Sequence, residues 1–253
     1  MRTATRIIAS ASLLVTLSST LTADVITDWN ENAVAAGTTA RAGGALHSRS
    51  MAIVQIAMFE AVNSIDPRYS PYRTRLQAEP GTSRDAAAAA AAHSALVHLF
   101  PEQQKDFDKA LQKSLASVPD GPSKTNGIRL GEQAAAAILT ERSKDGADAP
   151  NTYRPFTVAG KYVPTVFPVF PTWGAVRPFG LKSGDAVRPP APYALTSAQW
   201  AKDYNEVRAM GAKKGSSRTP EQTDIARFWE LTGPATYNPV SYTHLTLPTN
   251  REV

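Results

Sequence analysis

The sequence of 253 residues contains no cysteine. This absence excludes disulfide bonds, thiolate metal sites and a cysteine nucleophile, so packing alone must hold the fold together. A glycine-rich phosphate loop is also missing. Charged residues make up only 19% of the chain, with both signs interspersed and a net charge of +5. Because they form no basic stripe, we expect no nucleic-acid partner.

Long apolar runs are missing after the N-terminus, so we expect no membrane span. The N-terminus has the pattern of a secretory signal, with Arg2 and Arg6, an apolar or small stretch from Ile7 to Leu21, and a cleavage site at Leu21-Thr22-Ala23. A membrane anchor is the alternative, but the run is too short and too rich in serine and threonine to cross a bilayer well. We therefore expect residues 1–23 to be a signal peptide and the mature chain to be exported, either periplasmic or secreted.

Helical patterns dominate the mature chain, as apolar spacing, capping residues and helix breakers indicate. Helices are expected after an Asp28 cap, from Leu46 to Ile65, from Asp85 to Leu99 after a Thr82 or Ser83 cap, from Pro101 onward, from Ser123 to Arg142, from a Thr196 or Ser197 cap to Gly211, and after the capping box Thr219-Pro220-Glu221-Gln222. The second of these is apolar on nearly all sides and should be buried. No convincing strand pattern is present, so the predicted fold class is all-α, a helical bundle.

A proline-rich arm is expected over residues 144–194, where the prolines stand too close together for a helix to persist. The arm is also rich in aromatic side chains, which need a surface to pack on. These are Tyr153, Phe156, Tyr162, Phe167, Phe170, Trp173 and Phe179. The surface is either the chain's own bundle or a second subunit of a homo-oligomer.

Four stretches of the mature chain carry a family resemblance. They are Asp28-Trp29-Asn30, Met51 to Tyr72 (MAIVQIAMFEAVNSIDPRYSPY), Tyr153-Arg154-Pro155 through Trp173-Gly174 to Pro178-Phe179, and Arg218 to Trp229. In order and spacing they resemble bacterial vanadium-dependent haloperoxidases of the phosphatidic-acid-phosphatase type 2 superfamily. The resemblance covers residues 24–239, which we interpret as the N-terminal helical portion of such a domain.

The resemblance implies a vanadate cofactor, bound where related phosphatases bind phosphate. Peroxide on the vanadium would oxidise halide, which then reacts with a small organic substrate. In that family a lysine, two arginines, a Pro-Ser-Gly-His segment and a second histidine surround the oxyanion. Such a site is physically sensible, because cationic groups and backbone donors neutralise an oxyanion through charge-assisted hydrogen bonds.

The signatures of that oxyanion site are missing from this sequence. The first is a lysine, six residues and then Arg-Pro, whereas Lys182 and Arg188-Pro189 have five residues between them and lie in the arm. Arg154-Pro155 and Arg177-Pro178 have no lysine at the right spacing, and Pro-Ser-Gly-His is absent. We therefore predict no catalytic, cofactor-binding or metal-binding residue here, no vanadate bound to this chain, and no activity of the chain itself.

The histidines offer no replacement site. His47 is expected just before the buried helix. His93 and His98 are five residues apart, whereas two ligands on one helical face need a spacing of three or four. We interpret each of the three as a partly buried helix residue.

Two acidic features have structural interpretations. Glu60 lies within the helix expected to be buried, and we expect it to pair with Arg49 or Arg68. Asp145-Gly146-Ala147-Asp148 lacks the spacing of a calcium-binding loop, and we expect a loop at a helix end.

The last residues, 240–253, do not continue the helical pattern and resemble the translation of a transposon-end sequencing adapter. His244 falls in this segment and is therefore not considered a ligand. The sequence thus favours part of an exported haloperoxidase. An acid phosphatase of the same superfamily and a non-catalytic helical binding protein remain as alternatives.

Overall fold

The computed structural model describes residues 24–73, 75–164 and 166–229. The expected signal peptide and the segment 240–253 with His244 lie outside these residues. The described chain is all-helical and contains no strand, which confirms the predicted fold class. Its elements are α1 (Val25–Thr39), α2 (Gly44–Ile65), α3 (Arg84–Leu99), η1 (Pro101–Gln103), α4 (Gln104–Ala116), α5 (Pro122–Arg142), η2 (Trp173–Ala175), η3 (Gly184–Val187), α6 (Ala198–Gly211) and α7 (Pro220–Trp229).

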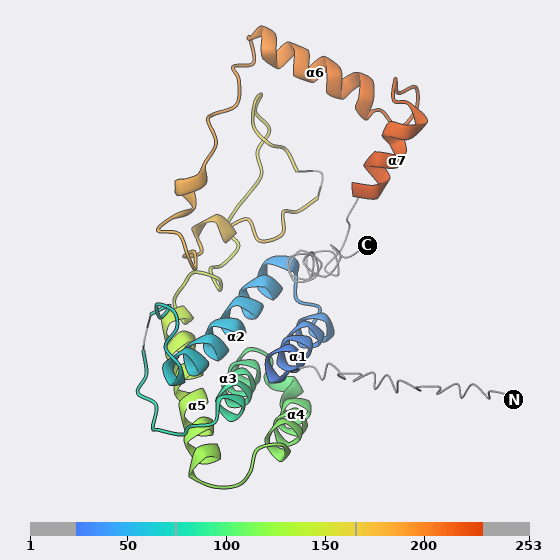
Figure 1. The fold of residues 1–253 in the computed structure, drawn as a ribbon. Helices are drawn as coiled ribbons and strands as arrows, with labels where there is room; N and C mark the ends of the chain where they lie inside the picture. Colours follow the sequence, from blue (N-terminus) through green and yellow to red (C-terminus); the bar gives the residue numbers. More distant parts are fainter. Residues whose placement is uncertain (1–23, 74, 165, 230–253) are drawn as a thin grey trace, which may run out of the picture.

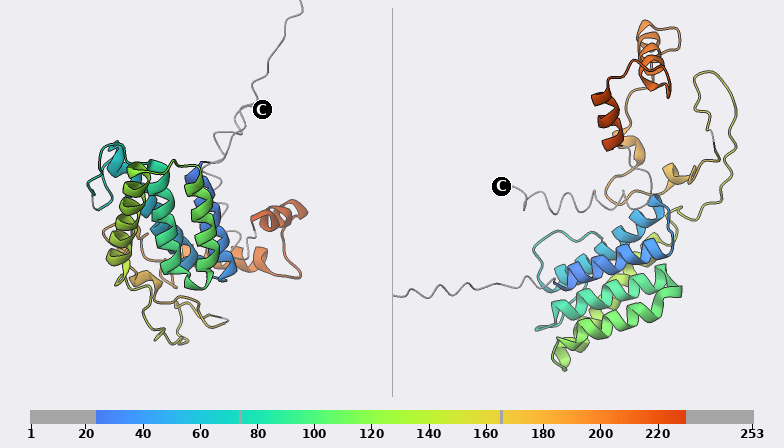
Figure 2. Two further views of the ribbon diagram at one scale, coloured as in Figure 1. Left: turned by 90° about the horizontal axis from the view of Figure 1, so that it is seen from below. Right: turned by 90° about the vertical axis from the view of Figure 1, so that its right-hand side faces the viewer.

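The helices α1 to α5 form a bundle, and an arm carries α6 and α7 away from one end of it (Figures 1 and 2). Within the bundle, α3 is the central helix and packs on α1, α2, α4 and α5. None of the described helices is long and apolar enough to cross a membrane.

Alanine lets the neighbours of α3 come close to its backbone. Residues 86–92 of α3 are all alanine and at most 1% exposed. On the facing side of α5, a Cβ atom added to Gly131 would lie 2.3 Å from the carbonyl oxygen of Ala87, and one added to Gly127 would lie 2.7 Å from that of Ser83. The two helices therefore touch through their backbones, and only glycine fits at these two positions.

Larger side chains fill the space between α3 and the remaining helices. Trp29 of α1 is completely buried, and its indole Nε1–H donates to Ser114 Oγ of α4 at 3.1 Å. From α2, Ile53, Val54 and Met58 are buried, as the apolar pattern of that helix predicts. The five helices thus supply most of the core, and Phe179 of the arm packs against it.

The expected cap of the first helix is wrong. Asp24 caps α1, because its carboxylate accepts a hydrogen bond from the Thr27 backbone N–H at 2.8 Å. Asp28 lies one turn further along. Its negative charge there interacts favourably with the positive end of the helix dipole, but its side chain does not cap the helix.

Other predicted caps are confirmed. Ser83 caps α3, and of the two candidates for α6 it is Ser197 that accepts from a first-turn N–H. At α7 the capping box is complete: Gln222 N–H donates to Thr219 Oγ1 at 3.1 Å, and Thr219 N–H donates to Gln222 Oε1 at 2.9 Å. Capping side chains therefore mark helix starts both in the bundle and on the arm.

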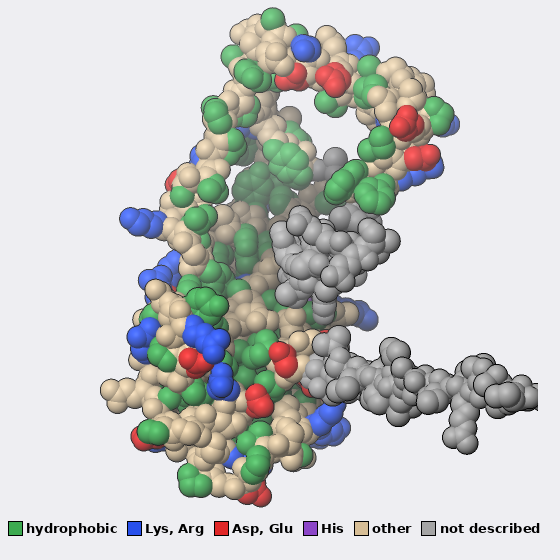
Figure 3. Space-filling model, in the orientation of Figure 1, with side chains coloured by type: hydrophobic (Ala, Val, Ile, Leu, Met, Phe, Trp, Pro, Cys, Tyr) green, Lys and Arg blue, Asp and Glu red, His purple; other side chains and the backbone are tan. Residues whose placement is uncertain are grey.

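The prediction that the arm's aromatic side chains all pack on a surface is wrong in part. Phe170, Trp173 and Phe179 are half-buried. Phe156 and Phe167, by contrast, are 59% and 75% exposed, and no residue of α6 or α7 is buried. Figure 3 shows hydrophobic side chains on the surface of this upper part of the molecule. The difference arises because only one stretch of the arm reaches the bundle.

The α3–α5 contact leads to a prediction about Gly131. We expect Gly131→Ala to lower the free energy of unfolding by about 1–3 kcal/mol, since the new methyl group meets backbone that must move. This loss should appear although alanine is the better helix former by about 1 kcal/mol. Urea titration measures it.

Gly211→Ala is the control, because there the nearest atom to the added Cβ lies at an ordinary 3.8 Å. Equal stability of the two variants would contradict the close backbone contact.

Candidate functional site

The C-terminal end of α5 holds a buried ionic cluster, Arg49, Arg142 and Asp145, which we call the α5 terminal cluster. The Asp145 carboxylate accepts hydrogen bonds from Arg49 Nε and Arg142 Nε, both at 2.8 Å. The side chains of Arg142 and Asp145 are 1% and 2% exposed. Arg49 also donates to the carbonyl of Arg142 at 2.9 Å. The arginines thus neutralise both the buried carboxylate and the negative end of the helix.

Asp145 stays ionised in this cluster. Burial is the largest influence and on its own raises the pKa of this carboxyl. The hydrogen bond from Arg49, the backbone N–H of Ala147 and the charges of Arg49 and Arg142 together outweigh burial and bring the pKa below its ordinary value. Asp145 and the residues after it form a loop at the helix end, as expected, with Gly146 at a positive φ of 91°.

Arg142 also binds the arm. Its guanidinium donates to the carbonyl oxygens of Arg177 and Pro178 and lies 3.8 Å from the centroid of the Phe179 ring. The backbone N–H of Arg177 in turn donates to the carbonyl of Asp145 at 2.9 Å. One guanidinium therefore joins the end of the bundle to the arm through hydrogen bonds and a cation–π contact.

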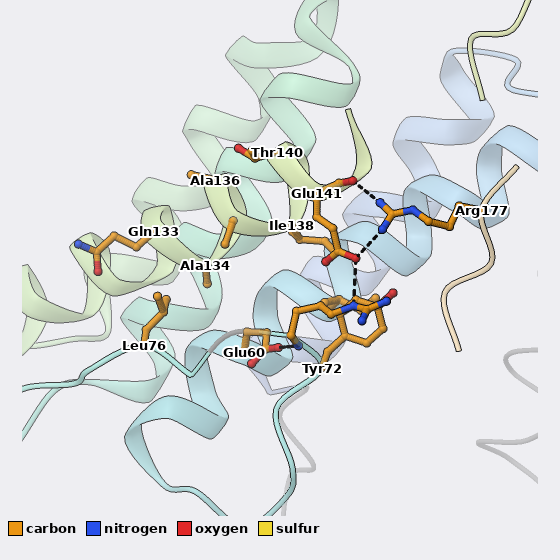
Figure 4. Close-up of a pocket in the computed structure, with 13 residues that line it drawn as sticks. Glu60, Tyr72, Leu76, Gln133, Ala134, Ala136, Ile138, Thr140, Glu141 and Arg177 are labelled. Atoms are coloured by element: carbon orange, nitrogen blue, oxygen red, sulfur yellow. Dashed lines mark hydrogen bonds and ion pairs between the residues drawn. The ribbon is translucent and has the colours of Figure 1, made fainter. Parts of the chain in front are cut away.

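A second ionic group lies at Glu141, the residue directly before Arg142 on α5 (Figure 4). Its Oε1 atom accepts from Arg73 Nε at 3.1 Å and is paired with Arg177 Nη1 at 3.3 Å. Arg177 also donates to the Glu141 carbonyl. This group thus ties the loop after α2 and the arm to the same helix end.

These charges form the rim of an open groove between α2 and α5. The groove has a volume of about 750 Å³. Its floor is apolar and consists of Ile56, Leu76, Ala134, Ala137 and Ile138. Such a surface suits an apolar ligand or a packing helix.

The predicted partners of Glu60 are wrong. Arg49 is bound to Asp145, and Arg68 pairs with Asp66 at 2.9 Å. Glu60 Oε1 instead accepts from the backbone N–H of Arg73 at 2.8 Å. The buried carboxylate therefore holds the loop after α2 in place, which is still the structural role expected of it.

His47 lies inside the first turn of α2 rather than before it. Its side chain is buried against Gly37, where an added Cβ would lie 2.4 Å from the imidazole. Burial lowers the pKa of His47 from its ordinary value of 6.5, and the Ala33 carbonyl offsets this only in part. The residue is a neutral packing element at the α1–α2 junction.

The other two helical histidines lie apart from each other. His93 of α3 contacts Asp108 of α4, with 2.7 Å between Nε2 and Oδ1, and it meets the Trp29 ring edge-on. His98 is exposed, so its expected partial burial is wrong. Within the described part of the chain, no group of three or more histidine, aspartate or glutamate side chains could hold a metal ion.

Neither of the two ionic groups fits a vanadate ion. The guanidinium groups of Arg142 and Arg177 are already matched by carboxylates and carbonyls, and no histidine lies with them in either ionic group. Arg188 pairs with Asp185 on the exposed arm, and Arg154 donates to carbonyls of its own loop. The Arg-Pro pairs of the sequence are thus not brought together around one site.

The sequence did not lead us to predict the α5 terminal cluster. The available signal was an arginine in the last turn of a predicted helix with an aspartate three residues later, Arg142 and Asp145. That spacing is common on exposed helix ends as well, and the burial of the pair depends on the arm, whose course the sequence does not reveal.

Removing the carboxylate of Asp145 should strongly destabilise the fold. Asp145→Asn leaves Arg49 and Arg142 buried without their counter-charge, which should lower the free energy of unfolding by about 3–5 kcal/mol. Asp185→Asn is the matched control, since Asp185 and Arg188 are exposed on the arm and a pair of that kind is worth at most about 1 kcal/mol. Losses of equal size in urea titration would argue against the cluster.

The lowered pKa of His47 makes stability depend on pH. As pH falls below 6.5, the unfolded chain binds a proton that folded His47 does not yet accept. The free energy of unfolding should therefore decrease on acidification, by at most about 1.4 kcal/mol per pH unit from this residue. Urea titrations at neutral and mildly acidic pH should give a smaller decrease for His47→Gln than for the wild type. His98→Gln, at an exposed position, should behave as the wild type.

Comparison with known proteins gives one informative similarity. No family model matches the sequence, and no curated protein matches it either. The chain is similar to a solved structure described as the first bacterial vanadium-dependent iodoperoxidase, with a TM-score of 0.58 and 21% sequence identity. The match covers 81% of this chain and 55% of that one, so the chain spans about half the length of the structure it resembles. The fold is therefore that of part of a haloperoxidase.

Proposed function

We propose that this chain is the N-terminal helical portion of an exported vanadium-dependent haloperoxidase, and that its own role is structural. The observation that carries the proposal is the similarity to part of a bacterial iodoperoxidase, with 55% of that chain covered. The family's motifs in residues 24–239 point in the same direction. The whole protein would use peroxide and vanadate to oxidise halide, and would pass the oxidised halogen to a small organic substrate.

The residues that would bind vanadate lie outside residues 24–229 in this proposal. The two ionic groups at the end of α5 use their arginines internally, so they would support the site and not contact the oxyanion. The exposed apolar side chains of α6 and α7, among them Val207, Ile225 and Phe228, would be covered by the rest of the domain. This stretch would then supply a rigid bundle on which the oxyanion-binding part is assembled.

The chain alone should therefore have no haloperoxidase activity. Purified residues 24–239 mixed with orthovanadate, hydrogen peroxide and iodide should form triiodide no faster than the same mixture without protein. Absorbance of triiodide measures this directly. Turnover that requires both the chain and vanadate would show that the oxyanion ligands are present after all.

Sequencing of the source DNA beyond the Pro239 codon tests the larger proposal. We expect the reading frame to continue into a Lys-x6-Arg-Pro segment, a Pro-Ser-Gly-His segment and a second histidine after an arginine. The protein made from that frame should oxidise halide with vanadate. Release of phosphate from esters without halide oxidation would point to the acid phosphatase, and a frame without these segments would leave the non-catalytic binding protein.

A further inference from the structure

The contacts between arm and bundle gather in one stretch, Phe170–Phe179, which we call the strap. It contains the short helix η2 and runs from the N-terminal end of α2 to the C-terminal end of α5. The arm on both sides is exposed, as Phe167 and Val187 illustrate at 75% and 71% exposure. The strap is therefore the part of the arm whose position the bundle determines.

At its first end, the strap is held by close packing on Gly43. A Cβ atom added there would lie 2.6 Å from Cε2 of the Phe170 ring. Phe170 has a φ of +53°, a conformation that non-glycine residues rarely adopt, and its ring meets Trp173 at 5.5 Å. Such a backbone conformation persists only where surrounding contacts hold it, so it belongs to the docked strap.

At its second end, the strap is held by polar contacts with Arg142 and its neighbours. Arg142 binds the carbonyls of Arg177 and Pro178 and stacks on Phe179. The Tyr72 hydroxyl donates to the Phe179 carbonyl at 2.7 Å. These contacts come from α5 and from the loop after α2, and they end on three successive residues of the strap, 177–179.

Between its two ends the strap forms one wall of an open pocket. The pocket has a volume of about 830 Å³, with Ala45, Ser48, Arg49 and Ala52 of α2 on one side and Trp173 and Val176 of the strap on the other. The strap adds Phe179 to the edge of the core, whereas the fully buried side chains all belong to α1 to α5. Release of the strap would therefore remove this wall and uncover Arg142 without unfolding the helices.

We infer that the strap is a movable wall of this pocket, held at Gly43 and Arg142, and that it docks and releases as one unit while the bundle stays folded. The strap and its contacts lie wholly within the described residues, and this behaviour does not depend on the proposed haloperoxidase function. Gly43 and Arg142 are then the positions that hold the wall of the pocket above α2, although they lie at opposite ends of the strap.

Hydrogen exchange measured by mass spectrometry on the purified chain tests this inference. In the docked strap the N–H groups of Trp173, Val176 and Arg177 donate to Phe170, Trp173 and Asp145 carbonyls. Phe179→Leu removes the cation–π contact at one end and leaves the Arg142–Asp145 pair intact, and Gly43→Ala introduces a clash at the other. Each variant should raise exchange across the whole strap by about tenfold or more and leave α3 unchanged.

Two matched controls accompany these variants. Gly174→Ala lies within the strap, where an added Cβ meets nothing within 4 Å, and Arg188→Met removes an arginine paired only on the arm. Both should exchange like the wild type. Arg142 itself is left unchanged in these variants, because its loss would deprive the buried Asp145 carboxylate of a counter-charge and destabilise the whole bundle.

Three results would overturn the inference. One is a strap that exchanges as fast in the wild type as the exposed arm beside it. Another is faster exchange confined to the end that carries the substitution. The third is an equal increase in α3, which would mean that strap and bundle unfold together.

Discussion

The backbone contact between α3 and α5 is the constraint on which the other features depend. A central helix in which half of the residues are alanine buries little apolar surface per residue, so it stabilises the bundle only if its neighbours approach very closely. Gly127 and Gly131 permit that approach on the α5 side. The approach also fixes the direction in which α5 ends, and thereby the place where Glu141, Arg142 and Asp145 act.

Arginine is well suited to the several contacts made at the C-terminal end of α5. Its planar guanidinium carries five donors in a fixed arrangement and also stacks on aromatic rings, so Arg142 satisfies a carboxylate, two carbonyls and a phenyl ring at once. A lysine ammonium group is a compact charge without a planar surface, so it could not make the same set of hydrogen bonds and also stack on the ring. An oxyanion-binding arginine needs the same donors free, whereas those of Arg142 are taken by partners within the fold.

Local signals in the sequence predicted much of the bundle and little of the site. The helices of the bundle, the Ser83 cap and the capping box at Thr219 were predictable, because apolar spacing and capping act over a few residues. The first cap was misplaced, since Asp24 and Asp28 are equally good caps in isolation. The partners of Glu60 and Arg49 were wrong, because side chains far apart in sequence meet only once the loop after α2 and the arm have taken their course.

The buried alanine side chains of α3 limit how sequences with this fold can diverge. Most core positions of a protein accept another apolar residue of similar volume, so substitutions accumulate there over time. At residues 86–92 and at Gly127 and Gly131 no larger residue fits without separating two helices. In related proteins with this fold, the core positions that hold large side chains can therefore accept substitutions. The positions that hold alanine and glycine must keep small residues.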